Sequence, residues 1–322
     1  MDLLNSESIF KKILFLTDGS APSLSAQELT IHLVKKMKAE VTVFHVVTHE
    51  LMRPIIQDFL VQSRGVPVSA DTEPGLIMDS EISLGRKTPS SGGSHYGERV
   101  EGEITSIYHQ EGEDIVADSA RTFREEGIQA EPKIVVHKNI VQAIMKEIER
   151  ENYDLVVMGR SGHKESESRL GAVAEKVSRR SEIPVLIAGE GKTIARLLMP
   201  LDGSKSSEKA LTYASSLAKK MDGKLTLLHV QESRLFRSRP KLTEAIGKKI
   251  LSDASGKLEG ISFEQKMETG DPARKITDMA EKDNFDLIVL GNSGHSSLGR
   301  SSFGGVTNHV LHYTRQAVLI VK

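Results

Sequence analysis

The sequence contains no cysteine, and this absence excludes several kinds of protein at once. Without a thiol there is no disulfide framework, no cysteine nucleophile and no cysteine-ligated zinc site. Long apolar stretches are missing too: the polar start lacks the apolar segment of a signal peptide, and no run approaches the ~18 residues of a membrane span. We therefore expect a cytoplasmic protein without a membrane partner.

An excess of charge is also missing. The chain has 43 Lys and Arg against 44 Asp and Glu, a formal net charge of -1, so we expect no nucleic-acid partner. With 38% hydrophobic and 27% charged residues, the composition is that of a folded protein. The 322 residues are about twice the ~150 of an average domain, which favours two domains or one domain used twice.

An internal repeat decides between these possibilities. Residues 13–46 match residues 197–230 at a constant offset of 184, with 13 identities in 34 positions, and Asp18-Gly19-Ser20 aligns with Asp202-Gly203-Ser204. A second block, residues 152–159, matches residues 284–291 at an offset of 132. The change of offset means that the first copy carries 52 extra residues. We call residues 1–190 the first repeat, with its insertion within 49–111, and residues 191–322 the second repeat.

Each repeat alternates short aliphatic runs with amphipathic stretches, the pattern of a parallel sheet covered by helices. We predict strands near residues 13–17, 41–47, 133–137, 154–158 and 184–188, and near 196–201, 224–230, 263–268, 286–290 and 317–321. In the insertion, residues 51–60 suit one face of a short helix, and the Gly-, Ser- and Pro-rich residues 64–97 favour a loop or a partly disordered flap. The insertion is read as a tolerated surface segment, or alternatively as a lid or a partner-docking element.

Glycines cluster where the predicted strands end. In an open parallel sheet ligands bind beyond these carboxyl ends, and glycine lets backbone N–H groups approach an anion. The second repeat has Asp202-Gly203-Ser204 after its first strand, a G-x-x-G from Gly291 to Gly294, and Gly304-Gly305 after nine intervening residues. This outlines a phosphate cradle, although short glycine pairs also serve plain turns. Three other motifs are missing, the P-loop, the dinucleotide G-x-G-x-x-G and the G-x-S-x-G elbow.

Together these motifs resemble the universal stress protein family in its tandem form, over the whole chain except the insertion. The resemblance implies two α/β domains of the adenine-nucleotide α-hydrolase-like type, each with a five-stranded parallel sheet of order 3-2-1-4-5. It also implies a pseudo-dimer in which residues 184–188 lie beside residues 317–321, which would hide two apolar edges. Many members of the family bind ATP or AMP, in some cases with Mg²⁺, and others bind no nucleotide.

Carried over residue by residue, the resemblance implies a nucleotide site in the second repeat. Asp202 would lie near the ribose and adenine, Val230 would contact adenine, and Gly270 belongs to the loop after the third strand. The phosphates would lie on the glycine turns and the helix that follows, at Gly291, Ser293, Gly294, Gly304, Gly305 and Val306. One departure is Gly305, where nucleotide binders carry Ser or Thr, and losing that hydroxyl costs roughly 0.5–1.5 kcal/mol.

The first repeat departs further from the family pattern. Asp18, Val46, Gly159, Ser161, Gly162 and Gly171 still fit a pocket. However, the second glycine spacing is one residue shorter, Ala172 follows Gly171, and Lys138-Asn139-Ile140 replaces Gly270-Asp271-Pro272. We therefore predict one working site in the second repeat and a degenerate site in the first.

Neither a catalytic residue nor a metal site is predicted. His309 and His312 have a helical spacing, but without a third ligand nearby they indicate an ordinary helix surface. His45 and His229 occupy equivalent strand positions and are interpreted as satisfied polar groups. His163, His295, Arg169 and Arg300 lie in the glycine loops, where they could touch phosphate or be solvated. Ser20 and Ser204 are natural helix N-caps rather than nucleophiles.

The leading hypothesis is a stress-response or signalling protein that binds an adenine nucleotide. It would also bind a protein partner that the sequence does not identify, and formation of a homodimer is left open. Any ATP hydrolysis is expected to be slow and incidental. One alternative is an interaction protein with no nucleotide, supported by Gly305 and Ala172. Another is an ATP-consuming transferase or hydrolase, for which the sequence shows no metal-binding carboxylate or activated nucleophile in a suitable place.

Overall fold

The computed structural model describes residues 9–48, 94–162, 170–294 and 303–322. In the first repeat the strands are β1 (Lys12–Leu16), β2 (Glu40–Val47), β3 (Ala130–Val136), β4 (Leu155–Met158) and β5 (Val185–Ile187). Those of the second are β6 (Arg196–Pro200), β7 (Lys224–Glu232), β8 (Phe263–Gly270), β9 (Leu287–Gly291) and β10 (Ala317–Val321). All ten lie within three residues of the predicted positions.

The ten strands form one sheet of order β3-β2-β1-β4-β5-β10-β9-β6-β7-β8. Each repeat contributes five parallel strands in the order 3-2-1-4-5 that the resemblance implies. The repeats meet where β5 and β10 pair antiparallel, with Leu186 opposite Leu319. The predicted pseudo-dimeric pairing of the last strands is therefore confirmed, and it covers two edges that would otherwise be open.

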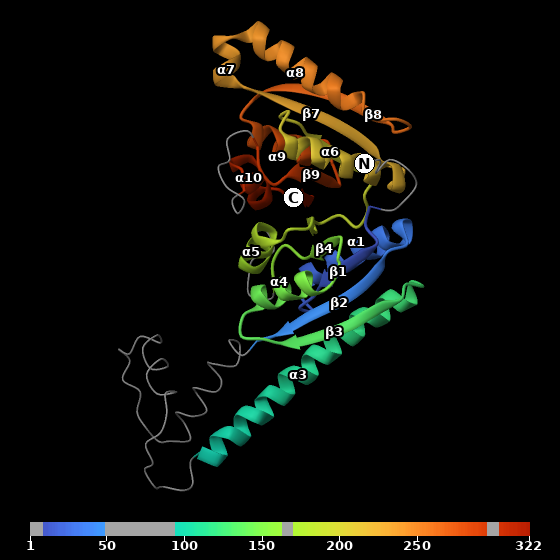
Figure 1. Cartoon of the computed structure of the whole chain (residues 1–322), viewed down its shortest axis with the longest axis vertical. Helices are drawn as coiled ribbons and strands as arrows, with labels where there is room; N and C mark the ends of the chain where they lie inside the picture. Colours follow the sequence, from blue (N-terminus) through green and yellow to red (C-terminus); the bar gives the residue numbers. More distant parts are fainter. Residues whose placement is uncertain (1–8, 49–93, 163–169, 295–302) are drawn as a thin grey trace, which may run out of the picture.

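Helices cover both faces of the sheet (Figure 1). One face carries α1 (Ala21–Met37), α3 (Ser94–Glu125), α6 (Lys205–Met221) and α8 (Pro240–Ser255), and the short α7 (Ser233–Ser238) precedes α8. The other carries α4 (Ile140–Arg150), α5 (Ala172–Arg180), α9 (Pro272–Lys282) and α10 (Gly305–Tyr313). Each face has one apolar core built from both repeats, so the two repeats share their cores.

Two sequence predictions need correction. Strand β3 starts at Ala130, three residues before the predicted start. The prediction missed these residues because Glu131 and Pro132 interrupt the apolar run on which it relied. The edge position of β3 explains why both are tolerated there. The loop predicted up to residue 97 ends earlier, because α3 already begins at Ser94. A helix held by packing along its later turns can propagate into polar residues of modest propensity. The rest of the predicted loop and the helix predicted at 51–60 lie outside the described residues.

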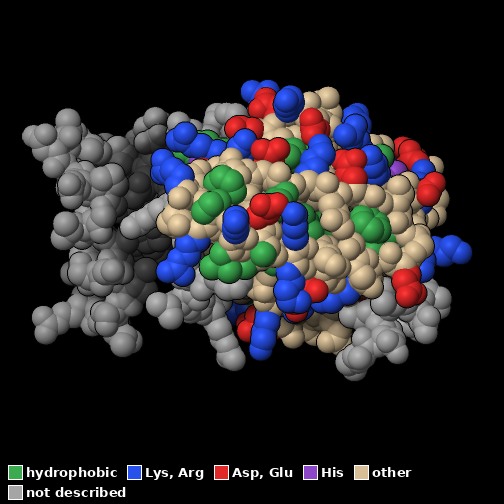
Figure 2. Space-filling view, turned by 90° about the horizontal axis from the view of Figure 1, so that it is seen from above, with side chains coloured by type: hydrophobic (Ala, Val, Ile, Leu, Met, Phe, Trp, Pro, Cys, Tyr) green, Lys and Arg blue, Asp and Glu red, His purple; other side chains and the backbone are tan. Residues whose placement is uncertain are grey.

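Helix α3 is twice as long as its counterpart α8, with 32 residues against 16. Its later turns pack on β2 and β3, and its first turns run beyond the body of the first repeat (Figure 1). At the opposite end of the molecule, α7 and α8 present basic and acidic side chains interspersed with apolar ones (Figure 2). Ion pairs such as Lys248–Glu244 and Lys249–Asp253 account for part of this mixture.

Candidate functional site

In the second repeat, Asp202 and Gly294 lie side by side beyond the carboxyl ends of β6 and β9. Asp202 follows β6, and its Oδ1 accepts a hydrogen bond of 3.0 Å from the Ser204 N–H. A Cβ added at Gly294 would lie 2.7 Å from Asp202 Oδ2. Only a residue without a side chain fits so close to this carboxylate, so the G-x-x-G turn and the Asp-Gly-Ser turn form one unit.

The second glycine pair joins this unit through the start of α10. Gly304 is the N-cap of α10, and its N–H donates a hydrogen bond of 3.1 Å to the Asn292 carbonyl. A Cβ at Gly304 would lie 3.2 Å from the Gly294 nitrogen, whereas a Cβ at Gly305 would meet nothing within 4 Å. The N-terminus of α10, with its partial positive charge, thus opens beside Asp202 and Gly294.

Gly291 has a structural role at this edge. A Cβ there would lie 2.2 Å from Ser206 Oγ and 2.8 Å from the Ser206 carbonyl oxygen. Thr307 Oγ1 donates to the Gly291 carbonyl at 2.9 Å, and Ser206 Oγ donates to Asn292 Oδ1 at 3.1 Å. Gly291 therefore lets the first turns of α6 and α10 close around the end of β9.

The remaining predicted residues lie along the same edge. Val230 is near the end of β7 and packs, as does Val306, against the core beneath α9 and α10. Gly270 ends β8, where the Lys275 side chain is its neighbour. Asp271 caps α9 by accepting from the Arg274 N–H at 2.9 Å. Asn139 does the same for α4 with Gln142, so the changed sequence in the first repeat keeps this cap.

The first repeat reproduces this arrangement. A Cβ at Gly162 would lie 2.8 Å from Asp18 Oδ2. The Gly171 N–H donates to the Arg160 carbonyl at 2.8 Å, as Gly304 does to Asn292. Although the loop between the glycines is one residue shorter, its two ends meet in the same way. The sequence differences that led us to predict a degenerate site therefore leave the contacts of Gly162 with Asp18 and of Gly171 with Arg160 in place.

The structure places a cavity of about 470 Å³ in the first repeat, at the carboxyl ends of β1, β2 and β4. Asp18, Val46, Gly159, Ser161, Gly162 and Gly171 all line it, so it is the predicted pocket of this repeat. The other lining residues, most of them apolar, are Leu16, Thr17, Ser23, Phe44, His45, Val47, Thr48, Tyr108, Glu111, Gly112, Ile115, Ile140, Ile144, Met158, Val173 and Ala174. Four of these come from α3, a contribution that sequence reasoning missed.

Ser161 is an unsatisfied polar group in the wall of this cavity. The residue is 8% exposed, and within the described part of the chain its Oγ has no hydrogen-bond partner. The equivalent hydroxyl of Ser293 donates to Asn292 Oδ1 at 3.2 Å. The first repeat has Arg160 instead of Asn292, and this replacement removes the acceptor.

The Arg160 side chain does not line the cavity, and instead contacts the second repeat. Its Nη1 donates to the Leu311 carbonyl at 2.6 Å and its Nη2 to the Gln316 carbonyl at 2.9 Å. Burial lowers the pKa of Arg160 to about 10, partly offset by the carboxylate of Glu190. The side chain that follows the first glycine of G-x-x-G thus joins the repeats, which sequence reasoning did not predict.

His45 and His229 are satisfied polar groups, as predicted. The Nδ1 atoms lie 2.8 Å from the Thr17 and Leu201 carbonyls, and since a carbonyl only accepts, each Nδ1 carries a hydrogen. A helical glycine lies over each ring: a Cβ at Gly112 or Gly247 would lie 3.0 or 2.7 Å from the imidazole Cδ2. This paired glycine–histidine packing, visible in the sequence only as helical glycines, holds α3 and α8 close to the sheet.

The other sequence predictions have mixed outcomes. Ser204 caps α6 by accepting from the Ser207 N–H at 3.2 Å, whereas Ser20 stands at the N-cap of α1 and donates to Asp18 instead. His309 stacks on Tyr313 with ring centroids 4.4 Å apart. Within the described ranges, no group of three metal-ligating side chains is present, and no helix is long and apolar enough to span a membrane. His163, His295, Arg169 and Arg300 lie outside the described residues.

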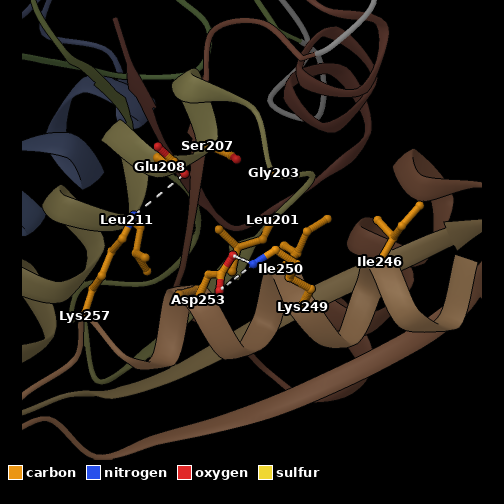
Figure 3. A pocket seen from close by; sticks show the side chains of 11 residues that line it. Leu201, Gly203, Ser207, Glu208, Leu211, Ile246, Lys249, Ile250, Asp253 and Lys257 are labelled. Carbon is orange, nitrogen blue, oxygen red and sulfur yellow. Dashed lines mark hydrogen bonds and ion pairs between the residues drawn. The ribbon is translucent and has the colours of Figure 1, made fainter.

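A smaller groove of about 180 Å³ lies between α6 and α8, next to Gly203 (Figure 3). Leu201, Leu211 and Ile250 form its apolar floor, and Lys249 pairs with Asp253 at 3.0 Å along its rim (Figure 3). Lys257 and Glu208 pair at 3.7 Å across the gap between the helices (Figure 3). The Lys257–Glu208 pair connects the residue range just after α8 with α6, so we interpret the groove as part of the packing between these two helices.

The family model of the universal stress protein family matches residues 81–189 and 193–322. Universal stress protein Slr1230 of Synechocystis is 24% identical over 314 residues, which are 96% of this chain and 99% of that protein. A universal stress protein from Archaeoglobus fulgidus superposes with a TM-score of 0.61 over 97% of this chain and 98% of its own, at 22% identity. A universal stress protein solved in complex with cAMP matches 40% of this chain and 98% of its own, at 25% identity and a TM-score of 0.33.

The matched segments cover most of the chain and fall on both repeats. The chain is therefore a tandem member of the universal stress protein family, as the motifs around Asp18 and Asp202 indicated.

Proposed function

We propose that the second repeat binds an adenine nucleotide, ATP or AMP, and that binding serves a stress-response or signalling role. The observation that carries this proposal is the convergence of Asp202, Gly294 and Gly304 beside the N-terminus of α10. Backbone N–H groups and a helix N-terminus favour phosphate, and an aspartate beside them suits a ribose hydroxyl.

A buried amide supports a base-binding role for the end of β7. Gln231 follows Val230, is 5% exposed, and accepts from Thr269 Oγ1 at 3.2 Å, while its Nε2 has no partner within the described residues. An unsatisfied buried donor is costly, and a purine offers ring-nitrogen acceptors. Any Mg²⁺ would enter with the phosphates.

The sharpest test uses Gly305, because a Cβ added there would meet no described atom within 4 Å. Gly305→Val therefore adds bulk at the mouth of the cradle where the described residues leave space for a Cβ, whereas Gly294→Val would push against Asp202. We expect Gly305→Val to weaken ATP and AMP binding at least tenfold in calorimetric titration of the full chain, with an unchanged unfolding midpoint. Ala172→Val, at the equivalent position of the first repeat, is the matched control and should leave this affinity unchanged.

Two results would contradict the proposal. If the full chain binds neither nucleotide, the interaction-protein hypothesis is favoured. If Gly305→Val binds as tightly as the wild type, the site lies elsewhere. Steady turnover of ATP that disappears in Asp202→Ala would instead favour an enzyme.

A further inference from the structure

We propose that Arg179 of the first repeat is a positioning residue for the phosphate cradle of the second repeat. This inference rests on the proposed function, because the quantity that Arg179 would control is the affinity of that cradle for phosphate groups. It deepens the proposed function by making the site of the second repeat depend on a side chain of the first.

Arg179 contacts residues on both sides of the glycine that caps α10. It lies in the last turn of α5, and its guanidinium carbon is 4.8 Å from the centroid of the Phe303 ring, which directly precedes Gly304. Its Nη2 also donates to Asn308 Oδ1 at 2.6 Å. The Asn308 N–H in turn donates to the Gly304 carbonyl at 3.0 Å, so one guanidinium holds the start of α10 from two sides.

The guanidinium is itself held in place on α5. Arg179 Nε donates to Glu175 Oε1 at 3.0 Å, one turn earlier on the same helix. Arg179 is only partly exposed and Phe303 is buried, so much of the contact between the cation and the ring is shielded from water. A cation over an aromatic face is attracted by the ring quadrupole, and the attraction is stronger where water is excluded.

A second cation approaches the same ring from the end of β10. Lys322 Nζ is 5.2 Å from the Phe303 centroid, and it donates to the carbonyl of Ser178 on α5. The residue before it, Val321, accepts from the Asn292 N–H at 2.9 Å. The ring, the end of β10 and the G-x-x-G turn therefore form one connected cluster at the contact between the repeats.

The first repeat lacks this arrangement. Helices α5 and α10 are equivalent at an offset of 133 residues. The residues at the equivalent positions are Leu170 for Phe303, His312 for Arg179 and Gly189 for Lys322. Since no aromatic ring precedes Gly171, the same cation–ring contact is not available there. The arrangement is specific to the repeat for which we predict the working site.

The physical consequence is preorganisation of the cradle. Backbone N–H groups at the start of α10 bind phosphate best when the Gly304 turn already holds them beside Gly294. Fixing that turn before the ligand arrives lowers the conformational entropy that is lost on binding. Removing the Arg179 contacts should therefore weaken the binding of phosphate groups and spare the binding of the base and ribose.

Calorimetric titration of the full chain with ATP, and competition of adenosine against ATP, test this inference. Arg179→Met keeps a long side chain but removes the cation and the donor to Asn308. We expect it to weaken ATP binding about tenfold and adenosine binding by less than about twofold. Arg179→Lys keeps the cation and should weaken ATP binding only about threefold. Arg180→Met, the same change at the exposed next residue, is the matched control and should leave both affinities unchanged.

A second variant tests the role of the ring. Phe303→Leu introduces the residue that the first repeat has at this position, and it should also weaken ATP binding more than adenosine binding. Adding Arg179→Met to Phe303→Leu should cost less affinity than Arg179→Met alone, because part of its effect passes through the ring. All titrations are made well below the lowest unfolding midpoint, so that a difference in stability does not change the folded fraction.

Three results would overturn this inference and leave the proposed function intact: an ATP affinity that Arg179→Met does not change, an equal loss of ATP and adenosine affinity, or fully additive effects of Arg179→Met and Phe303→Leu. If the wild type binds neither ATP nor AMP, the proposed function is wrong, and this inference is wrong with it.

Discussion

At the scale of single residues, Arg160 brings a full positive charge into the contact between the repeats. A buried cation is costly unless its donors are satisfied, and here two carbonyl oxygens near the end of α10 accept from it. The C-terminal end of a helix also carries partial negative charge, which favours a guanidinium. Arg160 is therefore a structural bridge, although it lies in a predicted ligand-binding turn.

Replacing Arg160 by methionine should lower the free energy of unfolding by about 2–4 kcal/mol. The volume is largely kept, but the carbonyls of Leu311 and Gln316 lose their donors. Urea denaturation of the full chain measures this change. The exposed Arg180 on α5 provides the control, since Arg180→Met should change the stability by less than about 0.5 kcal/mol. Equal effects of the two substitutions would show that the bridge contributes nothing.

At the scale of elements, glycines decide how closely helices approach the strand ends. Gly159 directly follows β4 and Gly291 ends β9, and a Cβ at either would press on the backbone of the first turn of α1 or α6. The same strand–helix contact thus recurs at equivalent positions. It positions the G-x-x-G turns against Asp18 and Asp202.

Gly291→Ala should therefore destabilise the protein by about 1–3 kcal/mol, because the Ser206 backbone 2.8 Å away cannot move aside without shifting α6. Gly305→Ala is the matched control: its Cβ meets open space at the start of a helix, and alanine favours helix. We expect the control to be neutral or slightly stabilising in thermal unfolding. A Gly291→Ala midpoint equal to the wild type would refute the proposed close contact.

At the scale of the whole molecule, the β5–β10 pair turns two repeats into one continuous sheet. All five residues of β10 are buried, and both apolar cores contain residues of both repeats. Neither repeat is an independent unit in this arrangement, because each covers the other's open edge.

A fragment of residues 191–322 should consequently dimerise through β10. Its exposed edge would pair antiparallel with the edge of a second fragment, as β5 does in the full chain. Sedimentation equilibrium at tens of micromolar should give twice the fragment mass. A folded but monomeric fragment would show that this edge does not drive the pairing.

Much of the fold could be predicted from the sequence, because aliphatic runs, turns and the constant repeat offset are local or pairwise properties. The ten strands and the pairing of the last strands were predicted, whereas the start of β3 at Ala130 was missed because edge strands do not need an apolar run. The convergence of Asp202 with Gly294 was implied by the family resemblance. The packing of Gly112 over the His45 ring was not predicted, because the sequence of a helix does not show which side chain of the sheet a glycine in it will contact.

By itself, the sequence determined that the chain is two copies of one α/β unit with glycine turns at the strand ends. Only the tertiary structure decided that Arg160 leaves its own site, that Ser161 consequently lacks an acceptor, and that α3 forms one wall of the cavity of the first repeat. The physical reason is that strand and turn patterns depend on neighbouring residues, while hydrogen-bond partners and cavity walls come from segments far apart in the chain. Sequence spacing cannot specify those distant partners.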